Sequence, residues 1–239
     1  KVYFSYLRKK LCKEIINKYK KIDIITFTNV FAHINDLNEV LECLKMLTSE
    51  NTIIVIENHY LGSILNKKQF DTFYHEHPRT YSLTSFFMIS KKINMSVVKY
   101  SFPKRYGGNI RVILSKSIKK KNNFKKVIKE KKFYKKILEL KKLIKIWKIN
   151  KKKEILQKNQ IYGPLPAKAF PGRAAILLKL LNFTNKNISA IYEKSISKKI
   201  GYFAPSTKIP ILSDVKLLKI DKKIPIINLA WHIDLEIKK

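Results

Sequence analysis

Apolar positions along this chain repeat with two different periods, which predict an alternation of strands and helices. Residues 22–28 and 52–57 are short, β-branched apolar runs, typical of buried parallel strands. Between them, residues 37–47 carry Leu or Val at intervals of three and four, the spacing of one helix face. A parallel β-α-β arrangement is therefore expected in this part of the chain.

The pattern changes after residue 82. Residues 82–93 begin with capping residues and continue as a predicted helix. Residues 95–101 and 109–115 follow as two strands, joined by a turn through residues 105–108. Helix and strand thus alternate until two strands come in succession, which predicts an α/β sheet whose last pair is antiparallel.

A Lys-rich stretch over residues 117–160 interrupts this order. It has no Gly or Pro, and its apolar residues recur at roughly helical intervals, at Val127, Phe133, Ile137, Leu140, Ile144 and Trp147. We expect one or two amphipathic helices that link a domain over residues 1–116 to a second domain over residues 161–239. A helix lying on nucleic acid or on a membrane is the alternative, but we prefer a solvated Lys face.

The α/β pattern resumes after the linker. Residues 163–168 are expected to form a loop, and Gly172 opens a helix that runs to Leu181. Residues 188–192 and 224–229 are predicted strands. We expect Gly172 to serve a structural turn, with anion binding at the start of its helix as the alternative.

The charge of the chain is extreme, with 51 Lys and Arg against 17 Asp and Glu and a formal net charge of +34. Such a balance suggests nucleic acid or anionic membranes as partners. The lysines, however, are spread from end to end, so we expect no nucleic-acid and no membrane partner, and a monomer. The positive charge still favours an anionic substrate such as a sugar diphosphate.

Cysteine usage and hydropathy bear on the compartment. Cys12 and Cys43 give no paired framework, which fits a reduced cytoplasmic setting. No apolar run is long enough to span a bilayer, and the first residues lack the layout of a signal peptide. We therefore expect a cytoplasmic protein.

The densest candidate chemistry lies in residues 70–82, which read Phe-Asp-Thr-Phe-Tyr-His-Glu-His-Pro-Arg-Thr-Tyr-Ser. Three of the five histidines lie between His59 and His77. Histidine titrates near neutral pH, and a neighbouring carboxylate can orient it or raise its basicity. This stretch is therefore the best candidate for catalysis, whereas pinning of a loop by the same histidines is the alternative.

Several ordered blocks resemble the S-adenosylmethionine-dependent sugar C-methyltransferases. Residues 70–77, followed by Tyr81-Ser82 and by Gly-Gly-Asn-Ile-Arg-Val at 107–112, resemble the core signature of that family. Residues 29–37 resemble the segment after the fourth strand of its methyltransferase domain, and the first residues resemble the preceding helix. Two later blocks resemble its carboxy-terminal domain, at residues 208–211 and 229–232.

The resemblance implies a fold and an activity. The expected fold is α/β, with the carboxy-terminal half of a class I, Rossmann-like methyltransferase domain, the Lys-rich helical linker and a smaller Rossmann-like α/β domain. The implied reaction is C-methylation of a keto sugar carried by a nucleotide, through an enolate formed by a base. By resemblance, His77 is the general base, Glu76 orients a histidine or bonds the sugar, and Tyr74 donates to the developing oxygen.

Further site residues follow from the same resemblance. Asn29 and His33 are expected to contact S-adenosylmethionine, and Glu57-Asn58-His59 ends a strand on the ligand side. Six residues are expected to line the sugar site: His75, Arg79, Tyr106, Gly107, Gly108 and Arg111. Helix capping or packing by His33 and structural ion pairs at Arg79 and Arg111 are the alternatives.

A metal site is the rival interpretation of the histidine-rich segment. In an extended segment His75 and His77 would share one face, with Glu76 opposite. Two histidines are too few for a closed zinc site, and the pattern is not the helical H-E-x-x-H. We therefore expect no metal among these residues.

The donor-binding signature of the family is not found in this sequence. None of the six glycines forms a G-x-G motif in the first third of the chain, and no Cys-rich zinc cluster occurs. We interpret the chain as the carboxy-terminal part of a longer enzyme, with zinc expected only in a preceding module; a gene that encodes only this remnant is the alternative. A non-catalytic basic protein that binds an anionic polymer or partner is the rival function, and methylation of a different acceptor is another.

A binding prediction follows from the missing glycine-rich loop. Without its backbone amides and the acidic residue of the second strand, this segment alone should bind S-adenosylmethionine weakly. Calorimetry on the isolated chain measures this affinity. Micromolar binding would show that the residues present suffice to hold the donor.

Overall fold

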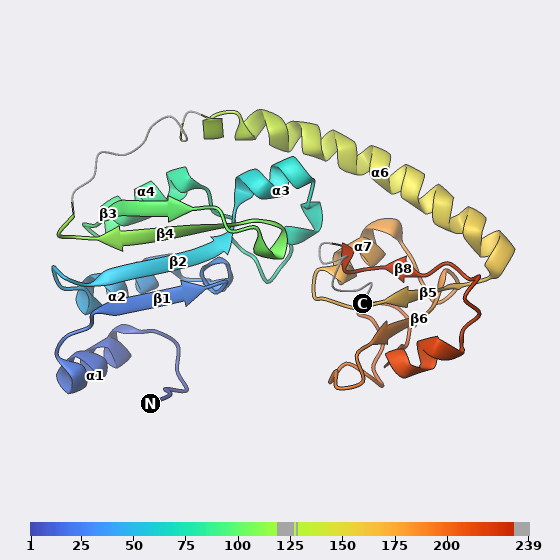
Figure 1. Ribbon diagram of the computed structural model, residues 1–239, viewed down its shortest axis with the longest axis horizontal. Helices are drawn as coiled ribbons and strands as arrows, with labels where there is room; N and C mark the ends of the chain where they lie inside the picture. The colour runs from blue at the N-terminus through green and yellow to red at the C-terminus, as the bar shows by residue number, and fades with distance from the viewer. Residues whose placement is uncertain (119–126, 128, 232–239) are drawn as a thin grey trace. The chain divides into compact units, whose positions relative to one another are not determined.

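The computed structural model describes residues 1–118, 127 and 129–231, which form two compact units. The first unit comprises residues 1–69 and 75–136, and the second comprises residues 70–74 and 137–239 (Figure 1). Part of the expected helical linker, residues 119–126 and 128, lies outside the described residues, as does His232 of the carboxy-terminal resemblance.

The first unit is built on a four-stranded sheet in the order β1-β2-β4-β3 (Figure 1). Its strands are β1 (Ile24–Thr28), β2 (Ile53–His59), β3 (Ser96–Ser101) and β4 (Asn109–Ser115). The first two are parallel, whereas β4 runs antiparallel to both β2 and β3. The predicted antiparallel pair at the end of the sheet is confirmed.

Two helices of this unit begin at residues whose side chains cap them. The Asp36 side chain accepts from the Glu39 N–H at the start of α2 (Leu37–Leu47). Ser82 and Ser85 form a reciprocal capping box at the start of α4 (Leu83–Lys92). Both helices bury apolar residues in the core of the sheet. The predicted helices 37–47 and 82–93 are thus confirmed, to within a residue at the ends.

Other elements of the first unit differ from expectation. Alternate residues of β1 are exposed, with Ile24 63% exposed, so the prediction of a buried strand is wrong. β1 lies at the edge of this sheet, and a β-branched run does not distinguish an edge strand from a central one. The helix expected before this strand is α1 (Lys9–Tyr19), whereas α3 (Leu61–Lys67), directly after β2, was not expected.

The second unit has a fully parallel sheet in the order β7-β6-β5-β8. Its strands are β5 (Leu165–Lys168), β6 (Ile188–Glu193), β7 (Ile211–Ser213) and β8 (Ile227–Asn228). The predicted strand 188–192 and the helix α7 (Ala174–Leu181) are confirmed. A 3-10 helix, η4 (Asp214–Lys219), follows β7.

Two predictions in this unit are wrong. The expected loop 163–168 contains the central strand β5, and Pro166 lies at a shift of its register with β6. Proline supplies no N–H to a ladder, and such an irregularity accommodates it inside a sheet. Strand 224–229 is reduced to the two residues of β8, and β7 was not expected.

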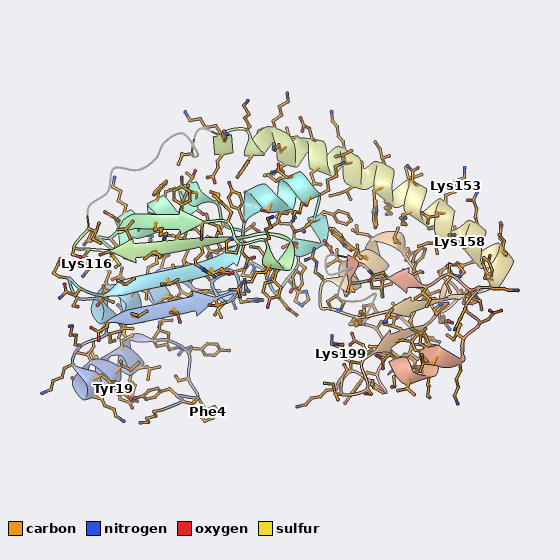
Figure 2. All side chains as sticks on the ribbon, viewed as in Figure 1. Phe4, Tyr19, Lys116, Lys153, Lys158 and Lys199 are labelled. Carbon is orange, nitrogen blue, oxygen red and sulfur yellow. The ribbon has the colours of Figure 1, made fainter. Side chains whose placement is uncertain are left out.

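The Lys-rich segment forms a 30-residue helix, α6 (Phe133–Tyr162). Leu140 and Ile155 are buried, whereas Ile137, expected on the same face, is 43% exposed. Lysine side chains extend from this helix over its length, and Lys153 and Lys158 are two of them (Figure 2). None of the helices in the described part of the chain has the length and apolarity that crossing a membrane requires.

A buried carboxylate stabilises the start of α4. Glu130 is 7% exposed, and its oxygens accept from the N–H groups of Leu83 and Thr84 at 2.9 and 2.8 Å. The Tyr60 hydroxyl donates to the same carboxylate at 2.9 Å. A negative charge is favourable at a helix N-terminus, where backbone N–H groups lack helical partners. Glu130 therefore joins a distant part of the chain to the core of the first unit.

Replacing this carboxylate should destabilise the first unit. Glu130→Gln keeps the size of the side chain but removes the charge, and we expect a loss of about 2–4 kcal/mol in the free energy of unfolding. Urea unfolding measures it. The exposed Glu139→Gln on α6 is the matched control and should change stability by less than about 0.5 kcal/mol. Equal effects of the two variants would contradict a specific role for Glu130.

Candidate active site

Polar side chains gather where β1 and β2 end and β4 begins. Asn29 directly follows β1, and Glu57 lies near the end of β2. The backbone N–H of Asn29 donates to the Glu57 carbonyl at 2.8 Å, and His59 faces Asn109 across the sheet. Figure 1 shows β1 and β2 ending on the side where β4 starts. In open α/β sheets this is the edge at which ligands bind.

The Glu57 carboxylate is the electrostatic centre of this edge. It is 2% exposed and accepts from Arg105 Nε at 2.6 Å, from Arg111 Nε at 2.7 Å and from Asn109 Nδ2 at 2.9 Å. Burial alone would raise the pKa of the carboxyl, but the donations from Arg105, Asn109 and Arg111 outweigh it and lower the pKa to about 2. Glu57 is therefore an anion that holds two guanidinium groups in place, and it is not suited to act as a base near neutral pH.

Asn109 connects this centre to β1. Its Nδ2 also donates to Asn29 Oδ1 at 3.1 Å, and Asn29 has a left-handed backbone with φ of 52°. Asn is among the residues that tolerate this conformation best. The buried Oδ1 of Asn109 has no hydrogen-bond partner among the described residues. An acceptor of this kind at a ligand edge is able to receive a donor from a bound molecule.

Three histidines meet beside this polar edge. The His77 ring lies against His33, with centroids 4.7 Å apart, and against His59, with centroids 5.3 Å apart. His33 belongs to the short helix η1 (Phe31–His33) after β1, and His59 ends β2. Residues from three separate stretches of sequence thus form one imidazole cluster, and imidazole is the side chain that most often serves as a general base.

The rest of the histidine-rich segment lies differently from what we expected. Residues 75 and 76 form a turn, so the prediction of an extended segment in which His75 and His77 share a face is wrong. The side chain of His75 is 81% exposed, and its Nε2 lies 4.0 Å from Glu76 Oε1. Tyr74 is grouped with the second unit, and Glu76 and His77 are grouped with the first. Side chains alternate between two faces only in a strand. The turn at residues 75 and 76 is not a strand, so this alternation does not apply to His75 and His77.

The residues expected to line the sugar site occupy two loops. Arg79 donates through an η nitrogen to the Ile34 carbonyl, beside the histidine cluster. Tyr106, in the 3-10 helix η3 (Arg105–Gly107), is 51% exposed and has a φ of 53°. Arg111 forms an ion pair with Glu57. This is the structural ion pair that the sequence analysis gave as the alternative role of Arg111.

The backbone conformation at positions 107 and 108 requires glycine. Their φ angles of 83° and 121° lie in the region that favours glycine. A Cβ at Gly107 would lie 2.1 Å from Gln69 Nε2, and one at Gly108 would lie 2.5 Å from Ser63 Oγ. The close approach at these glycines is thus to the protein's own side chains.

Sequence reasoning placed residues 57–59 on the ligand side but assigned no role to Glu57, His59 or Asn109. Their positions at predicted strand ends could have marked them as candidates. Such positions do not show which side chains form hydrogen bonds or ring contacts with one another. Within the described ranges, no group of three His, Cys, Asp or Glu side chains is arranged to hold a metal ion.

Comparison with known proteins identifies relatives of this chain. Residues 104–239, more than half of the chain, match the family described as the C-methyltransferase C-terminal domain. Over 100 residues the chain is 31% identical to the C-methyltransferase NovU of Streptomyces niveus, and the alignment covers 42% of this chain and 24% of that relative. The matched part thus spans about a quarter of the length of this curated relative.

The low pKa of Glu57 makes stability depend on pH in a defined window. Because the pKa falls from 4.5 to about 2 on folding, the carboxylate stabilises the fold fully above about pH 4.5 and loses this effect as the pH falls through 2. The contribution is at most about 3 kcal/mol. In urea unfolding at pH 5 and pH 2.5, Glu57→Gln should be less stable than wild type at pH 5, with a smaller difference at pH 2.5. The exposed Glu50→Gln is the control, and an unchanged difference would contradict the assignment.

Proposed function

The chain belongs to the C-methyltransferase family, and on that premise we propose that it takes part in methylating a carbon atom beside the carbonyl of a nucleotide-linked keto sugar, with S-adenosylmethionine as donor. The observation that carries the proposal is the cluster of His77 with His33 and His59 at the ligand edge of the first sheet. A carbon atom becomes nucleophilic when the proton next to a carbonyl is removed, which requires a positioned base.

His77 is the base in this proposal. One of its imidazole nitrogens accepts the proton on the carbon beside the carbonyl, and the electron pair left behind forms the enolate. The enolate carbon would then bond to the methyl carbon of the donor while the methyl–sulfur bond breaks, so that S-adenosylhomocysteine would leave with the electron pair of that bond. The proton on His77 then passes to water. Packing of the ring against His33 and His59 supports this role, because these contacts hold the imidazole at the ligand edge of the sheet.

The polar edge supports binding of the donor. The buried Oδ1 of Asn109 has no partner within the described part of the chain, and Nδ2 of the same side chain donates a hydrogen bond to Asn29. A ligand ammonium or hydroxyl would therefore find an acceptor there. Asn29 and His33 are the residues we propose to hold S-adenosylmethionine. When bound, this molecule supplies an electrophilic methyl group.

Positive charge supports an anionic sugar substrate. Arg105 and Arg111 each donate to Glu57 through Nε, and a guanidinium carries further donors suited to phosphate oxygens. Arg79 lies beside Ile34 in the same unit. We propose that Arg79 and Arg111 face the diphosphate, and that Tyr106 with Gly107 and Gly108 lines the sugar. Tyr74 and Glu76 keep the roles of hydrogen-bond donor to the developing oxygen and of orienting carboxylate.

The test separates the base from the donor site. In heavy water, a keto sugar exchanges the proton beside its carbonyl when a base removes it, and no methyl donor is required. With thymidine diphosphate 4-keto-6-deoxyglucose as probe, the wild-type chain should speed this exchange, followed by proton NMR. His77→Ala should slow it by about 10²–10⁴-fold, the usual contribution of a positioned base.

His75→Ala is the matched control. Its side chain is exposed and lies in the turn, so its loss should slow exchange much less. Binding of S-adenosylmethionine, measured by calorimetry, should be the same for wild type and His77→Ala. Full exchange activity in His77→Ala, together with an inactive His75→Ala, would assign the base to His75. Activity in both variants would make the cluster structural.

A further inference from the structure

His59 contacts the proposed base but does not itself take the proton from the sugar. It is the last residue of β2 and is half-buried, and its ring centroid lies 5.3 Å from that of His77, with the ring planes tilted by 46°. Both residues belong to the first unit. At this separation the rims of the two rings are close enough for a nitrogen of one to reach a nitrogen of the other, directly or through one water molecule.

The proposed reaction leaves a proton on His77 that has to depart before the next turnover. The nitrogen that takes the proton faces the sugar, and the bound sugar separates it from water. An imidazolium, however, carries a proton on both of its nitrogens. His77 is therefore able to release a proton from the nitrogen on the opposite side of its ring, provided that an acceptor lies there.

The other polar groups named at this edge of the sheet are poor acceptors for that proton. Glu57 and His59 are two positions apart in β2, so their side chains lie on the same face. Arg105, Asn109 and Arg111 hold the pKa of Glu57 at about 2, so its carboxylate takes up no proton near neutral pH. A guanidinium offers donors and no acceptor. A neutral imidazole has one acceptor nitrogen and titrates near neutral pH.

His33 is the other imidazole against His77, and its orientation suits the transfer less well. Its ring centroid is nearer, at 4.7 Å, but the two ring planes meet at 69°, an edge-to-face arrangement. The lone pair of an imidazole nitrogen lies in the ring plane, so a ring that presents its face presents no acceptor. His33 is also one of the residues that we propose to hold S-adenosylmethionine. His59 is thus the better acceptor for the proton of His77.

We propose that His59 is a proton relay for His77. An N–H bond of the His77 imidazolium breaks as a nitrogen of neutral His59 binds that proton, and His77 returns to its neutral form. His59 then releases the proton on its other nitrogen to water. The electron pairs stay on the nitrogens, so the transfer needs no oxidant or reductant. This inference rests on the proposed function of His77 as a base and gives a task to a residue that sequence reasoning left without one.

Three variants of the full chain test the relay. His59→Phe keeps a planar ring to pack against His77 but removes both nitrogens, so it separates packing from proton transfer. His59→Gln keeps a polar side chain that does not titrate, and it serves where the Phe variant folds poorly. His33→Phe is the matched comparison at the other neighbouring ring. Thermal unfolding reports the folding of each variant.

The measurement is exchange of the keto-sugar proton, with the same thymidine diphosphate sugar as probe. It is made at low and at high concentrations of imidazole buffer, because free imidazole accepts protons from solution as His59 would. A sugar that carries deuterium beside its carbonyl gives the primary isotope effect. This effect is large while breaking of the carbon–hydrogen bond limits the rate, and it falls towards one when a later proton transfer limits the rate.

Wild type should exchange at the same rate in both buffers and show a large isotope effect. At low buffer, His59→Phe and His59→Gln should exchange about 10–100-fold more slowly, with an isotope effect near one, because release of the proton from His77 then limits the rate. High imidazole should restore both the rate and the isotope effect. His33→Phe should show no dependence on buffer concentration, at whatever rate it retains.

Three outcomes would overturn the relay. The first is wild-type exchange at low buffer in both His59 variants. The second is slow exchange that keeps a large isotope effect and does not respond to imidazole, which would make His59 a packing partner of His77. The third is buffer dependence in His33→Phe alone, which would move the relay to His33.

These outcomes are distinct from failure of the proposed base. Slow exchange in His77→Ala together with wild-type exchange in His59→Phe would end the relay and leave the base in place. A wild-type chain that exchanges no sugar proton would remove the base and the relay together.

Discussion

The buried carboxylate of Glu57 is the interaction on which the candidate site depends. It lies near the end of β2, holds Arg105 before β4 and Arg111 within it, and bonds Asn109, which in turn bonds Asn29 after β1. One anion thus ties together the ends of two parallel strands and the start of an antiparallel one. Its desolvation is offset only while all three donors remain, so the residues of this edge are expected to form as a unit.

Buried carboxylates recur as fixing points in this very basic chain. The chain has 17 acidic residues against 51 basic ones, and three of the acidic residues, Glu57, Asp71 and Glu130, are buried. Each accepts from donors far away in sequence. Arg105 and Arg111 donate to Glu57, Arg173 before α7 donates to Asp71, and backbone N–H groups at the start of α4 donate to Glu130. Arginines hold Glu57 and Asp71, whereas backbone N–H groups and hydroxyls hold Glu130, so each carboxylate joins segments that are distant in the sequence.

The pairing of β1 with β2 determines where two of the three histidines lie. His33 and His59 are carried by the segments that follow β1 and β2, so their positions are set by the parallel pairing of those strands. His77 directly follows the turn at residues 75 and 76. In the proposed reaction, the sheet would orient the partners of the base.

The sequence by itself determined the α/β class, the helices α2 and α4, the antiparallel end of the first sheet and the family. These depend on local periodicity, on caps such as Asp36 and Ser82, and on motifs that are contiguous in the chain. Tertiary structure decided what depends on distant partners. It decided that β1 is an edge strand, that Pro166 sits at a register shift inside β5, and that residues 75 and 76 turn. It also decided that His59 joins His77 and that Asp71 meets Arg173, because such contacts join residues up to 102 positions apart and no local pattern encodes which partner a buried polar group will find.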